Sequence, residues 1–189
     1  MSAAIKAVLW DFGGVFTDSP FEAFAAFERG EITLAEFGDV FEAESRAVGP
    51  PVRGEAVVAL LYGDVRPQMV EALRRCKPHF INACLTNNVK TGSGHGLPTT
   101  ETKAREIAEI MALFDLVIES SRVGARKPEP RFYQLALERL GIEPQQAVYL
   151  DDLGINLKPA RALGMTTIRV ESPGQALAEL EQVLGLPLT

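Results

Sequence analysis

Polar residues that could carry out chemistry stand where apolar stretches of the sequence end. Asp11 and the pair Thr86 and Asn87 each follow such a stretch, and so does the pair Asp151–Asp152. Lys127 stands at the entrance of an expected helix. Because ligands of open parallel sheets bind at the carboxyl ends of the strands, these side chains are expected to meet at one edge.

The three aspartates of this set predict a metal site. Asp11, Asp151 and Asp152 would repel one another in a shared crevice unless a cation compensated their charge. Mg²⁺ fits because it prefers oxygen ligands and commonly takes one or two carboxylates together with a substrate phosphate. The backbone carbonyl of Gly13 offers a further oxygen ligand.

The remaining polar residues fit phosphoryl transfer. Thr86 and Asn87 can donate hydrogen bonds to phosphoryl oxygens, and Lys127 is a compact cation that can balance carboxylate and phosphate charge. With these groups around it, Asp11 can attack phosphorus while the cations stabilise the developing charge. The pattern predicts an enzyme that acts on a phosphate ester.

Apolar runs of strand length alternate with helical segments along the chain. They are Ile5–Trp10, Phe80–Leu85, Leu116–Ile118, Ala147–Leu150 and Thr167–Val170. Helical patterns cover Pro128–Leu140 and the segment that follows Ser172–Pro173. Strands that are apolar throughout and alternate with helices are typical of a parallel sheet covered on both faces. The predicted fold class is α/β, a Rossmann-like three-layer sandwich with a parallel central sheet.

The segment after the first strand departs from this alternation. Residues 18–63 contain helical patterns but no strand, and Thr33 with Glu36 forms a capping box. We interpret residues 18–63 as a small helical cap inserted into a core made of residues 1–17 and 64–189. A cap in that position would lie over Asp11. Ordinary connecting helices are the alternative.

Composition narrows the class of partner. The chain has 189 residues, 47% of them apolar, and a formal net charge of −6, which disfavours binding to nucleic acid or anionic lipid. No apolar run reaches the about 18 residues that span a membrane. The start of the sequence shows a strand pattern without a basic flank or an apolar signal region, and two cysteines are too few for a disulfide framework. We expect a cytoplasmic protein, monomeric or homodimeric, whose partner is a small-molecule phosphate.

Several longer motifs resemble the haloacid dehalogenase superfamily, and within it the N-terminal phosphatase domain of soluble epoxide hydrolase. The motifs are Arg29–Leu34, Cys84–Asn88, Val117–Ser121, Lys127–Pro130 and Leu150–Arg161. The resemblance covers nearly the whole chain and implies a Mg²⁺-dependent phosphatase.

The same resemblance implies a role for each site residue. Asp11 is the nucleophile that becomes aspartyl-phosphate, and Lys127 stabilises the phosphoryl group that Thr86 and Asn87 bind. Asp11, Asp152 and the Gly13 carbonyl are expected to hold Mg²⁺. Asp151 supports them from beside the ion, and Asn156 supports the acidic loop.

The sequence departs from the superfamily pattern at two places. Gly13 stands where phosphatases usually carry a second aspartate that protonates the leaving group. Only Phe21–Glu28 separates Ser19–Pro20 from Arg29–Glu31, so the cap is expected to be shortened. Two alternatives therefore stay open: a non-catalytic module kept for binding or dimerisation, and a metal-independent 2-haloacid dehalogenase.

Overall fold

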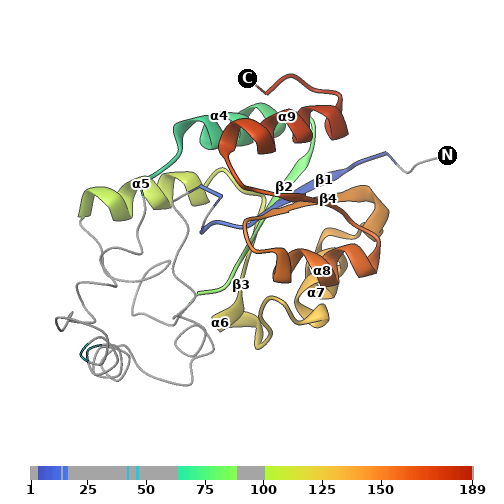
Figure 1. Ribbon diagram of the computed structural model, residues 1–189, viewed down its shortest axis with the longest axis horizontal. Helices are drawn as coiled ribbons and strands as arrows, with labels where there is room; N and C mark the ends of the chain where they lie inside the picture. The colour runs from blue at the N-terminus through green and yellow to red at the C-terminus, as the bar shows by residue number, and fades with distance from the viewer. Residues whose placement is uncertain are drawn as a thin grey trace.

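The computed structural model describes residues 4–13, 15–16, 42, 46, 64–88 and 101–188 of the chain. Five strands form one sheet (Figure 1). They are β1 (Ala7–Trp10), β2 (Ile81–Thr86), β3 (Leu116–Glu119), β4 (Ala147–Asp151) and β5 (Thr166–Arg169). All neighbouring strands are parallel, in the order β3-β2-β1-β4-β5. The predicted parallel α/β architecture is confirmed.

Helices cover both faces of this sheet. They are α4 (Pro67–Cys76), α5 (Glu101–Met111), the short α6 (Ser120–Val123), α7 (Pro130–Leu140), α8 (Gly154–Leu163) and α9 (Pro173–Leu184), with a 3₁₀ turn at Pro144–Gln146. Figure 1 shows α4 and α9 together on one side of the sheet and α7 and α8 on the other. The result is the predicted three-layer arrangement.

Alternation along β1 divides the core into two layers. Val8 and Trp10 pack among side chains of α4, α5 and α9, whereas Ala7 and Leu9 pack among side chains of α7 and α8. Successive side chains of a strand point to opposite faces, so a strand buried on both faces must be apolar at every position. This explains why β1 reads as an uninterrupted apolar run.

The strand order places Asp11 at the centre of the sheet edge. β1 lies between β2 and β4, and the chain passes from β1 through β2 to β3 on one side before it crosses to β4 on the other. Such a reversal of winding opens a crevice at the carboxyl ends of the central strands. Asp11 follows β1 at that point, and its N–H donates to the Leu150 carbonyl of β4.

The observed boundaries differ from the predicted ones by one or two residues. Thr86 and Asp151 are the last residues of their strands rather than the first residues after them. Helix α7 begins at Pro130 instead of Pro128, and its N-cap Glu129 is extended. The residue before a proline is disfavoured in helical conformation, which accounts for the later start.

The predicted cap lies almost wholly outside the described residues. Within 18–63 the structure describes only Glu42 and Arg46, which form an ion pair at 2.6 Å. The division into a core and a cap therefore stays a prediction. In the described part of the chain, no helix has both the length and the apolar character needed to cross a membrane.

Candidate active site

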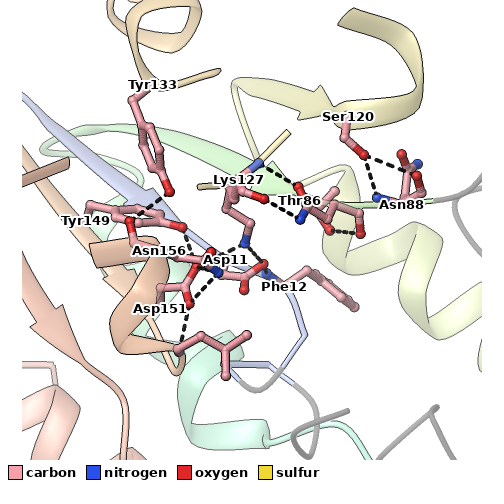
Figure 2. A network of polar contacts seen from close by, with 12 residues as sticks. Asp11, Phe12, Thr86, Asn88, Ser120, Lys127, Tyr133, Tyr149, Asp151 and Asn156 are labelled. Carbon is pink, nitrogen blue, oxygen red and sulfur yellow. Dashed lines mark hydrogen bonds and ion pairs between the residues drawn. The ribbon is translucent and has the colours of Figure 1, made fainter. Parts of the chain in front are cut away.

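A buried lysine links two aspartates from neighbouring strands. The Lys127 ammonium lies 2.6 Å from Oδ1 of Asp11 and 3.0 Å from Oδ2 of Asp151 (Figure 2). All three residues are buried, Asp151 completely. Two carboxylates and one cation that the sequence separates widely thus form a single charge cluster at the carboxyl edge of the sheet.

Asn87 fixes the backbone of Lys127. Its side-chain Oδ1 accepts from the Lys127 N–H at 2.9 Å, and its Nδ2 donates to the Lys127 carbonyl at 3.1 Å. These two bonds anchor the loop after α6 to the end of β2. The Asn87 carboxamide is thus bonded to the Lys127 backbone, and the predicted role of Asn87 in binding phosphate stays a prediction.

The next residue, Asn88, joins the end of β2 to the end of β3 and the start of α6. Asn88 donates to the buried Glu119 carboxylate at 2.6 Å, and its backbone N–H donates to the Ser120 hydroxyl at 2.9 Å. The Ser120 hydroxyl donates in turn to the Asn88 carbonyl, and the Ser121 hydroxyl donates to Asn88 Oδ1 at 2.7 Å. Asn88, Glu119, Ser120 and Ser121 belong to the motifs of the sequence resemblance, although the sequence assigned them no role.

Asp151 is surrounded by hydrogen-bond donors. Its Oδ2 accepts from Lys127, from the hydroxyl of Tyr149 and from Nδ2 of Asn156 at 3.0 Å. Its Oδ1 accepts from the Leu153 N–H at 2.8 Å and from Asn156 at 3.0 Å. Asn156 thus donates to both oxygens of the Asp151 carboxylate, and the supporting role that the sequence resemblance implies stays a prediction.

Two tyrosines donate hydrogen bonds to this loop and were missed by the sequence analysis. Tyr149 donates to Asp151, and Tyr133 donates from α7 to the Asn156 carbonyl at 2.7 Å. Their rings meet edge to face with centroids 5.6 Å apart. The sequence could have indicated Tyr149, because it is a polar aromatic residue in an otherwise aliphatic strand. It stands two positions before Asp151, and residues two apart lie on the same face of a strand.

The charge cluster shifts the pKa of each member. Burial raises the pKa of Asp11 well above its ordinary value, with Lys127 opposing the shift and Asp151 adding to it. Burial also acts to raise the pKa of Asp151, but Lys127, Tyr149 and the Leu153 N–H outweigh it, so this pKa is lowered. For Lys127, burial acts to lower the pKa, and the two carboxylates more than compensate and raise it. Lys127 and Asp151 are therefore held in their charged forms, while Asp11 resists ionisation.

The acidic residues fit a divalent cation. Ligand atoms of Asp11, Asp151 and Asp152 lie within 4.8 Å of one another. When all three aspartates are ionised, they exceed the charge of the Lys127 ammonium by two, which a divalent cation would balance. Oxygen ligands of this kind suit Mg²⁺.

The structure also locates the other residues predicted for the site. Thr86 ends β2 half-buried, and its hydroxyl donates to the Asn87 carbonyl at 3.3 Å. Asp152 is half-buried beside Asp151, and Gly13 is half-buried two residues after Asp11. The predicted residues thus come together at one edge, whereas their individual roles stay predictions.

Comparison with known proteins identifies the family of this chain. The family of haloacid dehalogenase-like hydrolases matches residues 5–164. The chain belongs to this family. It is 43% identical over 122 residues to the bifunctional epoxide hydrolase 2 of Sus scrofa, which covers 65% of the chain and 21% of that protein. The resemblance to epoxide hydrolase predicted from the sequence is confirmed.

Another relative is matched along its whole length. The chain is 27% identical over 207 residues to a sesquiterpene phosphatase of Aspergillus oryzae, which covers 98% of the chain and all of that protein. By contrast, the chain spans only 19% to 30% of the length of the mammalian relatives that it matches.

Solved structures share the fold. A HAD family enzyme from Bacteroides thetaiotaomicron, in complex with magnesium and inorganic phosphate, superposes with a TM-score of 0.64 at 21% identity. The match covers 94% of the chain and 99% of the Bacteroides enzyme. At this identity the likeness establishes the fold alone.

Replacing Asp151 by asparagine should destabilise the metal-free protein strongly. Each partner of Asp151 is a donor, so an amide NH₂ at this position would face donors and leave the buried Lys127 with one carboxylate. Breaking a buried ion pair typically costs about 3–5 kcal/mol. We expect a loss near that size for Asp151→Asn in urea-induced unfolding. The exposed control Glu138→Gln should stay within about 0.5 kcal/mol of the wild type. A loss below about 1 kcal/mol for Asp151→Asn would contradict this account.

Replacing Asp11 by asparagine should have the opposite effect. Because the pKa of Asp11 is raised in the folded state, its stabilising contribution is complete below the unfolded pKa of about 4 and is lost as pH rises through the folded pKa. Asp11→Asn removes this loss. In the presence of a chelator, its melting temperature should exceed that of the wild type at pH 7.5, and the gain should shrink towards pH 4.

The control for this pH series is Glu109→Gln. It also removes one negative charge, from a side chain that is 72% exposed. A pH-independent gain for Asp11→Asn, or an equal gain for the control, would show that burial of Asp11 is not the cause.

Proposed function

We propose that the protein is a Mg²⁺-dependent phosphatase that hydrolyses phosphoric monoesters of small organic molecules through a phosphorylated Asp11. The observation that carries this proposal is the Lys127 ammonium held between Asp11 and Asp151. It compensates a carboxylate nucleophile and offers positive charge where a phosphoryl group would sit. Similar proteins support the proposal, since they include a sesquiterpene phosphatase and an enzyme whose structure contains magnesium and inorganic phosphate.

Asp11 is suited to the role of nucleophile. Its Oδ1 accepts from Lys127 and from the Phe12 N–H, both at 2.6 Å. Among the residues that the structure describes, no donor is bonded to its Oδ2. That oxygen forms the bond to phosphorus while the bond from phosphorus to the ester oxygen breaks. Water then attacks phosphorus, the bond to Asp11 breaks, and orthophosphate leaves.

Donors to the phosphoryl group would come from the end of β2, and positive charge would come from Lys127 in the loop after α6. We assign the Thr86 hydroxyl and the Asn87 backbone N–H to phosphoryl oxygens, because the Asn87 carboxamide is bonded to Lys127. Asp11, Asp152 and the Gly13 carbonyl would hold Mg²⁺, with Asp151 behind them. When bound, the ion neutralises charge on the phosphoryl oxygens.

Gly13 restricts the range of good substrates. A glycine has no proton to give to the departing ester oxygen, and general acid–base catalysis contributes about 10²–10⁴-fold. Aryl and acyl phosphates need little protonation on leaving, whereas alkyl phosphates need much. We therefore propose that turnover falls steeply from aryl and acyl phosphates to alkyl phosphates.

A phosphate-release assay tests the proposed function. The panel contains aryl, acyl, sugar and isoprenoid phosphates, each with Mg²⁺ and with a chelator. Release should require both Mg²⁺ and Asp11, and Asp11→Asn should abolish it although this variant stays folded. Absence of release from every substrate, with Mg²⁺ still bound, would favour a non-catalytic module. Chloride release from a 2-haloacid in the presence of chelator would favour a dehalogenase.

Introducing a carboxyl group at position 13 should change the substrate ranking. We expect Gly13→Asp to raise kcat/KM for alkyl phosphates by about 10²-fold or more and to change aryl phosphates much less. Gly13→Asn is the matched control, since it adds nearly the same volume without a transferable proton. An equal change for both classes of ester would mean that another residue already protonates the leaving group.

A further inference from the structure

Tyr149 brings a buried hydroxyl group to the charge cluster from inside the core. It lies on β4 two residues before Asp151, is completely buried, and donates to Oδ2 of Asp151. The same oxygen accepts from Lys127 and from Asn156. Burial and the nearby carboxylate charges raise the pKa of Tyr149, so the hydroxyl keeps its proton and stays a donor.

The distances around Lys127 show what this donor can do. The ammonium is closer to Asp11, at 2.6 Å, than to Asp151, at 3.0 Å. Asp151 is completely buried, so its carboxylate is out of reach of bulk solvent. If Oδ2 of Asp151 lost the hydrogen bond from Tyr149, it would attract the Lys127 ammonium more strongly. The ammonium would then move towards Asp151 and away from Asp11.

We propose that Tyr149 is a positioning residue: by satisfying Oδ2 of Asp151, it sets how the Lys127 ammonium is divided between Asp151 and Asp11. Its effect on catalysis rests on the proposed function, whereas its effect on Lys127 does not. Tyr149 does not touch the reacting atoms and acts only through Asp151.

The hydroxyl can be removed without disturbing the ring. Tyr149 packs edge to face against Tyr133, and the Tyr149→Phe variant keeps that contact. Tyr133→Phe is the matched comparison, because it also removes one buried hydroxyl bonded to the acidic loop. That hydroxyl contacts the Asn156 backbone and not Asp151. Urea unfolding of both variants measures the loss of stability that any missing buried hydrogen bond would cause.

The first experiment uses the metal-free protein and makes no assumption about activity. The full chain is labelled with ¹⁵N-lysine, and the Lys127 ammonium signal is assigned by its loss in Lys127→Met. We expect this signal to shift in Tyr149→Phe and to stay near its wild-type position in Tyr133→Phe. An unmoved signal in Tyr149→Phe, or equal shifts in the two variants, would overturn the proposal whatever the enzyme's activity.

The second experiment asks whether the placement of Lys127 matters for the phosphoryl site. Beryllofluoride with Mg²⁺ serves as an analogue of the phosphoryl group, and its binding is followed by fluorescence of Trp10, the single tryptophan, which directly precedes Asp11. Loss of a group that orients a metal-site residue typically costs about 10–100-fold. We expect weakening in that range for Tyr149→Phe, a fall in kcat with little change in KM, and smaller effects for Tyr133→Phe.

The two experiments separate the possible failures. A shifted Lys127 signal without beryllofluoride binding or phosphate release in the wild type would keep the positioning role and remove the proposed function. Equal weakening of beryllofluoride binding in both tyrosine variants would overturn the proposal, since it would trace the effect to general loss of stability.

Discussion

A buried lysine ammonium needs other groups to replace the water molecules that solvate it in the unfolded chain. Lys127 finds them in Asp11 and Asp151, which contribute opposite charge from the ends of two adjacent strands. Burial of an ion pair stabilises a fold only when the remaining hydrogen-bonding capacity of both partners is also satisfied. The donors around Asp151 satisfy that carboxylate, and the Asn87 carboxamide satisfies the backbone N–H and carbonyl of Lys127. Much of the polar structure at this sheet edge therefore serves the placement of a single cation.

The carboxylate of Asp11, the proposed nucleophile, is less well compensated than that of Asp151. Among the described residues, Asp151 has donors at both oxygens and Asp11 has donors at one, and burial raises the pKa of Asp11. An under-satisfied buried carboxylate lowers the stability of the metal-free protein and is at the same time a better nucleophile and metal ligand. Such sites are common in enzymes, because pKa values are shifted where catalysis needs them. A divalent cation next to Asp11 and Asp152 would balance the charge that Lys127 leaves over.

Family membership and the local departure at position 13 bear on different parts of the reaction. The shared fold supplies the sheet edge, and the matched residues 5–164 contain the candidate nucleophile, the cation and the acidic pair. The absence of a carboxyl group at position 13 would affect the departure of the leaving group. We therefore expect the formation of phospho-Asp11 to be the conserved part of the chemistry. The choice of ester is where this chain would differ from phosphatases that carry a carboxyl group at that position.

The sequence by itself determined the elements and most members of the site. Apolar runs defined five strands to within two residues. Polar residues at their ends indicated Asp11 and Thr86, and the start of a helical pattern indicated Lys127, because these signals are local. The tertiary structure decided which groups meet. The strand order puts β4 beside β1 and so brings Asp151 to Lys127, 24 residues away in sequence, while Asn87 reaches across 40 residues to the Lys127 backbone. The partner of the Tyr149 hydroxyl was likewise hidden in the sequence. Hydrogen bonds of this kind follow from the order and register of the strands, which depend on packing of the whole core and not on local propensity.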